Sequence, residues 1–426
     1  MGREEERLFR LLEEGTSAAL TVKAAEKQLE AAGFEELSFA HSWRLVERGK
    51  YFVKHHDTSL FAFTVGEQAG PETVRIAAAH TDFPCLRIKP CADMEAGGYA
   101  QINVEVYGGA ILNTWLDRPL SISGRVALAS EDVLHPEIRC ISVERTLGVI
   151  PNLAIHMNRD VNKGIELNKQ TDLLPILGLA SEGQKRPFLD FLAGELGRKP
   201  EDILDYELCL YCQEKPGYAG LEEELILSPR LDNLTSVQAL LTGITESSRQ
   251  KGINVIALFD HEEVGSRTKQ GAGSMLLLHL LQRILQCFGK TPAQWAECLY
   301  QAFFLSVDVA HGLHPNKMGK MDLTNKPLLG KGFCIKEASS QSYATDCEAV
   351  AIVEQICRKE HIPYQKFVNR SDMPGGGTLG SIASSFLPVR TADVGIPLLA
   401  MHSAVETMAA RDMKALADLL RAYFRI

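Results

Sequence analysis

Five short motifs place histidine and carboxylate side chains where they could bind divalent metal ions. In chain order they are HTDFP, SPRLDN, DHEEVGS, SVDVAHG and MHSAVE. His80 and His402 offer imidazole nitrogens, and Asp232 and Asp308 offer carboxylate oxygens. A mixed set of nitrogen and oxygen ligands suits Zn²⁺, and Co²⁺ or Mn²⁺ can substitute for it. The motifs therefore predict a metal centre assembled from distant parts of the chain.

Further carboxylates stand beside these ligand candidates. Asp82 follows His80 by two residues, so it can hold the second imidazole nitrogen, as is usual for a zinc-bound histidine. The DHEEVGS motif adds Asp260, Glu262 and Glu263. Because adjacent carboxylates repel each other, a positive charge is expected near the two glutamates. We expect one of them to bind metal and the other to act as general base for water that the metal activates.

Each motif taken alone also has a structural explanation. His80 and Asp82 fit a strand-end histidine followed by a capping carboxylate. Asp232 fits the N-cap of the helical run that begins near Leu234. The two glutamates fit a solvated acidic loop. The presence of all five motifs in one chain favours the metal centre.

The ligand candidates follow predicted strands of an α/β sheet. Residues 74–80, 253–260 and 303–310 are apolar and rich in β-branched residues, which is typical of strands buried on both faces of a largely parallel sheet. Residues 397–407 are predicted to contain the last strand, which ends in His402. Open α/β sheets bind ligands at the carboxyl ends of their strands. We therefore expect the candidate ligands to meet at one edge of the sheet.

The remaining pattern predicts the domain organisation. Residues 4–33 predict two helices with a cap at Thr16 or Ser17 and a stop at Gly33. Short strands bounded by glycine, with one helix near 188–197, dominate the segment from 91 to 226. Strand and helix alternation then resumes, with helices predicted at 274–289 and 344–361. The predicted fold is α/β, with a mixed, largely parallel sheet and helices on both faces formed by residues 1–90 and 227–426, and an inserted β-rich domain at 91–226.

Composition excludes several classes of protein. A formal net charge of −9 and a pI near 5.8 argue against a nucleic-acid-binding protein, because phosphate recognition needs clustered basic side chains. No apolar run is long enough for a membrane span, and the acidic start MGREEERLFRLLEEG does not resemble a secretory signal, so we expect a cytoplasmic protein. Ten scattered cysteines suit reduced thiols. The CxxC pair Cys209 and Cys212 alternates like a strand, which favours core cysteines over a zinc site.

The five motifs resemble those of the aspartyl aminopeptidase family, which includes the yeast vacuolar aminopeptidase and bacterial relatives. The inserted segment adds GGAILNTWLDRPL and IPNLAIHMNRDVN, and the match runs nearly the full length of the chain. The resemblance implies a metalloaminopeptidase with two zinc ions per subunit that releases N-terminal residues, preferentially Asp and Glu, from peptides. It also implies a dodecamer built from dimers, with contacts made by the inserted domain.

The resemblance assigns the metal ligands individually. It implies that Asp232 bridges both zinc ions. His80 and Asp308 would complete the site of one ion, and Glu263 and His402 the site of the other.

The resemblance also assigns the catalytic and substrate-binding residues. Asp82 would orient the metal-binding histidine. Glu262 would take a proton from the water between the ions as this water attacks the carbonyl, and would pass it to the leaving amine. The positions that match residues around the substrate are His156, Asp260, His311, Lys336 and Tyr343.

Two of these positions have competing interpretations. Lys336 could pair with an acidic substrate side chain, or it could be a solvated surface lysine. His156 lies in the insertion and would serve the active site of a neighbouring subunit, or it could be a core histidine in an apolar strand. The stretch SDMPGGGTLGSI departs from the family pattern at Gly375, Gly377 and Ser381, which bears on pocket shape.

Other functions remain open at this stage. The chain could be an aminopeptidase of neutral, leucine-type specificity, or a deacylase on the same α/β core, although the insertion motifs count against a deacylase. A catalytically silent assembly or cargo-binding protein with this fold is a further alternative. Such proteins commonly lose a ligand or the base, whereas all six positions are present here.

Overall fold

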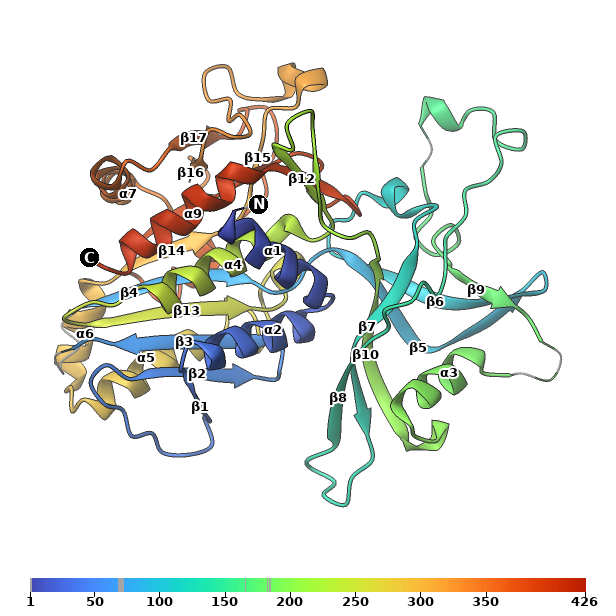
Figure 1. Cartoon of the computed structure of the whole chain (residues 1–426), viewed down its shortest axis with the longest axis horizontal. Coiled ribbons are helices and arrows are strands. Elements are labelled where there is room, and N and C mark those ends of the chain that lie inside the picture. The colour runs from blue at the N-terminus through green and yellow to red at the C-terminus, as the bar shows by residue number, and fades with distance from the viewer. Residues whose placement is uncertain (1, 68–72, 165, 182, 184) are drawn as a thin grey trace. The chain divides into compact units, whose positions relative to one another are not determined.

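The computed structural model describes residues 2–67, 73–164, 166–181, 183 and 185–426, which form two compact units (Figure 1). The first unit comprises Met1–Asp82, Pro216–Met401 and Glu406–Ile426, and the second comprises Phe83–Lys215 and His402–Val405. The predicted insertion overlaps the second unit. Within the described residues, no helix is long and apolar enough to cross a membrane.

A nine-stranded sheet forms the centre of the first unit, as far as this unit is described. Its strands, in spatial order, are β1 (Glu35–Leu37), β2 (Lys50–His55), β3 (Ser59–Val65), β13 (Ile253–Phe259), β4 (Val74–His80), β14 (Phe303–Val307), β18 (Arg390–Gly395), β16 (Phe333–Glu337) and β17 (Tyr364–Val368). The four central strands from β13 to β18 are parallel. Antiparallel pairs join β2 to β3, β3 to β13 and β16 to β18. The prediction of a mixed, largely parallel sheet is confirmed.

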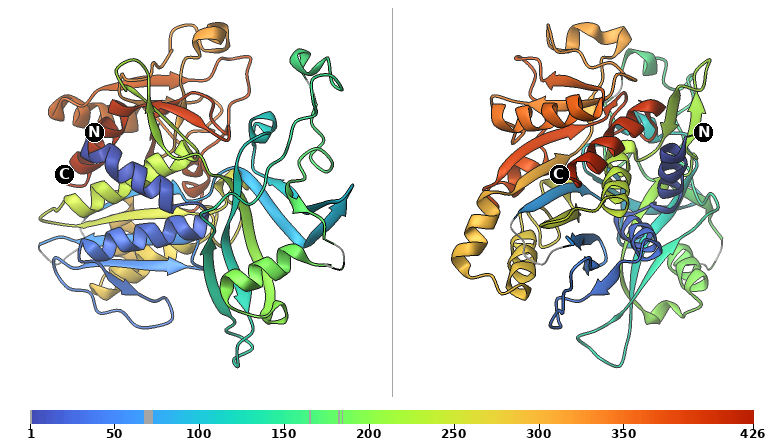
Figure 2. Two further views of the ribbon diagram at one scale, coloured as in Figure 1. Left: turned by 45° about the vertical axis from the view of Figure 1, so that its right-hand side comes forward. Right: turned by 60° about the vertical axis from the view of Figure 1, so that its left-hand side comes forward.

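Helices cover both faces of this sheet (Figure 2). On one face, α4 (Leu231–Glu246) packs on β4 and β13, and it is covered by α1 (Arg3–Glu14), α2 (Ala18–Ala31) and α9 (Ala410–Tyr423). On the other face, α5 (Leu276–Cys287), α6 (Pro292–Tyr300) and α8 (Leu379–Ala383) share one apolar core with alternate residues of the central strands. α7 (Cys347–Glu360) packs on β18 and α9.

The two predicted N-terminal helices end and begin where the sequence indicates. The Ser17 hydroxyl accepts a hydrogen bond from the Leu20 amide at 3.4 Å, which satisfies one of the unpaired amides at the start of α2. Gly33, which has a φ of +81°, follows the end of α2. The left-handed conformation there favours glycine.

The second unit is built on an antiparallel sheet. Its strands, in spatial order, are β8 (Glu137–Ser142), β7 (Leu120–Leu128), β10 (Ile203–Cys212), β5 (Cys85–Ala96), β6 (Tyr99–Tyr107) and β9 (Ile176–Leu179). α3 (Pro187–Leu196) contacts β5, where the Asp93 carboxylate accepts the Phe188 amide at 2.7 Å. Cys209 and Cys212 are buried in β10, and the Cys209 thiol donates to the Ser123 carbonyl at 3.4 Å. These contacts favour core cysteines.

Smaller elements complete the chain. In the first unit, β11 (Gly217–Ala219), β12 (Leu225–Ser228) and β20 (Glu406–Ala409) form one sheet, and β15 (Ala310–His311) pairs with β19 (Pro397–Leu398). Short 3-10 helices are η1 (Leu112–Trp115), η2 (Val161–Lys163), η3 (Pro200–Asp202), η4 (Glu262–Val264) and η5 (Pro315–Lys320). The prediction of one strand ending in His402 is wrong, because β19 ends at Leu398 and His402 lies in a turn with a φ of +66°.

Candidate metal centre

Three adjacent parallel strands bring the predicted ligands to one edge of the main sheet. β4 lies between β13 and β14. His80 is the last residue of β4, Asp308 directly follows β14, and Asp260 directly follows β13. Phe259 at the end of β13 pairs with His80, so these strands end at the same level. The predicted convergence at the carboxyl ends of the strands is therefore observed for these residues.

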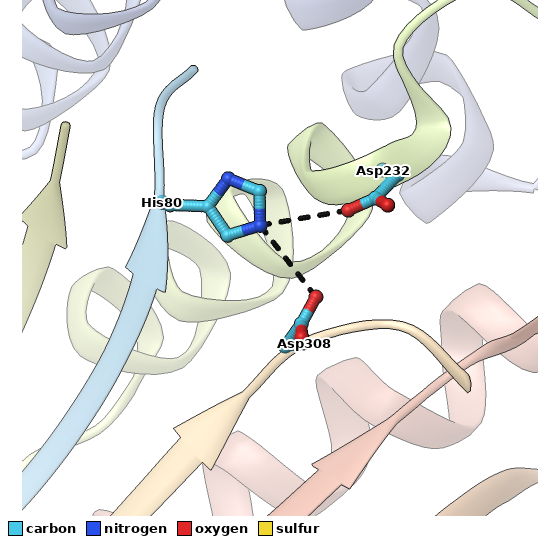
Figure 3. Close-up of side chains that lie close together, drawn as sticks. All are labelled: His80, Asp232 and Asp308. Carbon is cyan, nitrogen blue, oxygen red and sulfur yellow. Dashed lines mark ion pairs between the residues drawn. The ribbon is translucent and has the colours of Figure 1, made fainter. Parts of the chain in front are cut away.

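His80 lies at the centre of the cluster. Its Nε2 lies 3.5 Å from Asp232 Oδ1 and 3.6 Å from Asp308 Oδ1 (Figure 3). Its Nδ1 lies 3.0 Å from the carbonyl oxygen of Asp82 and 3.4 Å from that residue's Oδ1. If Nδ1 carries the proton and donates to Asp82, the lone pair of Nε2 points between the other two carboxylates. This is the tautomer that a metal-binding histidine needs.

Asp232 is fixed by backbone and side-chain contacts at the start of α4. Asp232 and Asn233 have non-helical dihedral angles, so the regular helix begins after them. The amide of Asp232 donates to Glu406 Oε2 at 3.0 Å, and the Asn233 side chain donates to the Val307 carbonyl at 3.0 Å. The Asp232 carboxylate faces His80 and is not the helix N-cap. The structure therefore favours the ligand interpretation over the capping one.

Asp82 positions the loop that carries the two glutamates. Its Oδ1 accepts the Glu262 amide and its Oδ2 accepts the Glu263 amide, both at 3.1 Å. The loop turns through His261, with a φ of +62°, and Gly265, with a φ of +98°. Asp82 thus contacts the backbone of both glutamates as well as His80. The sequence predicted only its contact with the histidine.

The crowding of carboxylates shifts several pKa values. Burial raises the pKa of Glu262 to about 8; His80 acts against this rise, and Asp308, Asp82 and Asp232 add to it. Burial, together with the charge of Asp82, raises the pKa of Asp260 to about 6. Burial lowers the pKa of His80, but the surrounding carboxylates raise it well above its ordinary value. The cluster therefore binds positive charge, as a proton or as a metal ion.

The donor set fits a divalent metal ion. Ligand atoms of His80, Asp232 and Asp308 lie within 4.8 Å of one another, and so do those of His80, Glu262 and Glu263. One imidazole nitrogen among carboxylate oxygens is a donor set that zinc accepts. These residues therefore provide an environment in which zinc can bind.

Lys336 lies beside this cluster and is only 1% exposed. Its Nζ lies 3.4 Å from Asp308 Oδ2, donates to the Val309 carbonyl at 3.0 Å, and lies 5.0 Å from the centre of the Tyr343 ring. Tyr343 is also buried. The interpretation of Lys336 as a solvated surface lysine is wrong.

The remaining predicted site residues are His311 in the first unit and His156 and His402 in the second. His311 is exposed at the end of β15, with its ring 6.0 Å from that of Phe367. His156 is exposed in a turn of the second unit, so the interpretation as a core histidine in a strand is wrong. His402 belongs to the short segment grouped with the second unit, where its Nδ1 lies 3.2 Å from the Gly109 carbonyl. Its role as a ligand stays a prediction.

Sequence reasoning missed two buried carboxylates that lie beside these site residues. Glu406 accepts the amide of Asp232, and Asp393 lies in β18 opposite Lys336. The MHSAVE motif contains Glu406, so its position was available as a signal. Asp393 stands in RTADVG, where nothing local distinguishes it from a surface residue.

Comparison with known proteins identifies the family. The family described as "Aminopeptidase I zinc metalloprotease (M18)" matches residues 11–424. The chain belongs to this family. A "Probable M18 family aminopeptidase 2" from Clostridium novyi (strain NT) is 45% identical over 386 residues, which cover 90% of this chain and 89% of the relative. This M18 protein is therefore a zinc-dependent aminopeptidase.

Solved structures agree with the fold of this M18 aminopeptidase. A cryo-electron microscopy structure of the Ape4 and Nbr1 complex contains a chain with a TM-score of 0.94 and 33% identity, and the match covers 98% of this chain and 84% of that chain. The structure of the S. cerevisiae mApe1 dodecamer gives a TM-score of 0.84 at 22% identity, with 99% and 96% covered. The second likeness shows the fold alone.

Proposed function

We propose that this M18 aminopeptidase acts in the cytoplasm and releases N-terminal residues, preferentially Asp and Glu, with two zinc ions and Glu262 as general base. The observation that carries the proposal is the buried meeting of His80, Asp232 and Asp308 beside Glu262 and Glu263. His80, Asp232 and Asp308 lie at the ends of rigid strands and at the start of a helix, so the fold itself sets their positions.

The ligands divide between the two proposed ions as follows. Asp232 would be shared, His80 and Asp308 would complete one site, and Glu263 and His402 would complete the other. The contact of His402 Nδ1 with the Gly109 carbonyl supports this assignment, because a proton on Nδ1 would put the lone pair on Nε2, as a metal-binding histidine needs. When bound, zinc polarises the peptide carbonyl and lowers the pKa of the attacking water.

Glu262 moves the proton in the proposed reaction. Its carboxylate accepts a proton from water as the water oxygen bonds to the carbonyl carbon, and it returns that proton to the amine nitrogen as the carbon–nitrogen bond breaks. Asp82 accepts the Glu262 amide and so helps to fix the position of the base.

The acidic preference rests on Lys336, and the structure gives this residue other partners. A substrate carboxylate would have to draw its ammonium group away from Asp308 and the Val309 carbonyl. The burial of Lys336 and these contacts favour a second candidate, an aminopeptidase with neutral specificity. The variant Lys336→Met separates them: a much larger loss of cleavage for Asp- and Glu-peptides than for Leu-peptides supports acidic recognition, and equal losses contradict it.

The second unit is proposed to mediate assembly, with His156 serving the active site of a neighbouring subunit. The turn that carries His156 exposes the apolar side chains of Leu153, Ile155 and Met157. Burying such side chains against another copy of the chain would be favourable. A dodecamer is the proposed state, and a dissociated form that retained full activity would contradict the role of His156.

A panel of substrates tests the proposed function. The panel contains peptides with N-terminal Asp, Glu, Leu, Ala or Lys and an N-acetylated control, each assayed before chelation, after chelation and after zinc is restored. We expect zinc-restored cleavage of Asp- and Glu-peptides and an inert acetylated control. Preference for Leu would replace the acidic specificity, and cleavage of the acetylated control would indicate a deacylase. No cleavage by assembled, metal-loaded protein would favour a silent scaffold.

A further inference from the structure

Asp393 is a buried carboxylate that is not among the proposed metal ligands. It is fully buried in β18, directly across the β16–β18 pair from Lys336. Residues that face each other across antiparallel strands project to the same side of the sheet. The cation and the carboxylate therefore share one buried environment.

Asp393 is held from both sides by neutral donors. Its Oδ1 accepts the Thr378 hydroxyl at 2.6 Å, and its Oδ2 accepts the Ala344 amide at 2.6 Å. Its surroundings are tightly packed, because a Cβ atom added at Gly380 would lie 3.0 Å from Asp393 Oδ1. Burial raises the pKa of Asp393, and Lys336 and these donors act against that rise. These contacts are arranged to support a carboxylate.

Lys336 connects Asp393 to the centre. The two carboxylate oxygens of Asp308 contact different groups. Oδ1 lies 3.6 Å from His80 Nε2, and Oδ2 lies 3.4 Å from Lys336 Nζ. A buried ammonium group thus stands next to a proposed zinc ligand.

We propose that Asp393 is a positioning residue that balances the charge of Lys336 and thereby maintains zinc affinity at Asp308. Without Asp393, Lys336 is a buried cation whose carboxylate neighbour Asp308 is also needed by the metal ion. Its uncompensated charge opposes the binding of another cation, because charges interact strongly where water is excluded. This inference rests on the proposed function, in which Asp308 binds zinc.

The test measures zinc dissociation constants by chelator competition on the full-length protein, with folding checked by circular dichroism. The variants are Asp393→Asn, Lys336→Met and the double variant. We expect Asp393→Asn to weaken zinc binding by about 10- to 100-fold, the range found for residues that support metal ligands. Lys336→Met should bind zinc at least as tightly as the wild type. The double variant should regain most of the affinity lost in Asp393→Asn.

A merely structural role would give another pattern, in which both single substitutions weaken zinc binding and the double variant is no better than the worse one. That pattern, or unchanged affinity in Asp393→Asn, would overturn the inference. Asp412→Asn is the matched control, because Asp412 is also fully buried and accepts the Gly330 and Gly332 amides. We expect it to leave zinc affinity unchanged.

Two further outcomes are decided by the same experiment. If Asp393→Asn does not fold, Lys336→Met decides alone, because weaker zinc binding in that variant contradicts the charge-balance argument and equal or tighter binding supports it. A wild-type protein that binds no zinc would overturn the proposed function together with this inference. Wild-type binding with no effect of Asp393→Asn would overturn the inference alone.

Discussion

The metal-free protein should become less stable as the pH rises from about 5 to about 8.5. Glu262 has a pKa of about 8 in the folded chain, because burial and neighbouring carboxylates disfavour its charge. The unfolded chain releases this proton near the ordinary value of 4.5, so between these values the folded state holds more protons. Stability therefore falls with rising pH. The raised pKa of His80 acts in the same direction, because stability from its charged form is lost as the pH rises through the folded-state value.

The size of the effect follows from these pKa values. At about 1.4 kcal/mol for each pKa unit, the rise from 4.5 to about 8 for Glu262 corresponds to about 5 kcal/mol. The rise for Asp260, from 3.8 to about 6, corresponds to about 3 kcal/mol. The two groups share neighbours, so their contributions do not simply add. Burial lowers the pKa of the half-buried His55, which acts in the opposite direction. We expect a net loss of about 3–5 kcal/mol.

Urea denaturation of chelated protein at pH 5.5, 7 and 8.5 measures this loss. Zinc binding needs deprotonated ligands, so the stabilisation on adding zinc should grow over the same range. In the metal-free state, Glu262→Gln should show a smaller loss with pH, whereas Glu297→Gln on the exposed part of α6 should behave like the wild type. Stability of the chelated protein that is constant or rises between pH 5.5 and 8.5 would refute the reasoning.

Three further substitutions test individual contacts. Asp82→Asn can accept only one of the two amides that Asp82 holds, so zinc affinity should fall by about 10- to 100-fold in chelator competition, and unchanged affinity would contradict this role. Gly332→Ala places a Cβ 2.0 Å from a backbone oxygen at a φ of +92°, so urea denaturation should show a loss of more than about 1 kcal/mol. Arg421→Ala removes a partner of Glu4 and one of the partners of Glu246. Because Arg3 and Arg7 still pair with Glu246, the same assay should show a loss of about 1–2 kcal/mol. Wild-type stability in either of these last two variants would contradict the corresponding argument.

The sequence predicts the strands that carry the centre because their burial leaves a local pattern. β4, β13 and β14 lie between neighbours and under helices, so their residues are mostly apolar. Ligand candidates at the ends of such strands must meet if the strands are parallel neighbours. His80, Asp260 and Asp308 could therefore be placed together before the structure was known.

Strands with buried charges were not predicted. β16 contains Lys336 and β18 contains Asp393, and both side chains look like surface residues in the sequence. Their burial depends on each other and on Asp308, which are far apart in the chain. Local hydrophobic patterns contain no such information. The turn at His402 was mistaken for strand for a related reason, since the apolar run before it continues past the end of β19.

The zinc content of the purified chain tests the central claim most directly. Elemental analysis of zinc-saturated, desalted protein should give two ions per chain, and Asp308→Ala should lose one of them while circular dichroism shows a folded protein. A wild-type value of one or zero, or an unchanged value in Asp308→Ala, would contradict the two-ion centre proposed here.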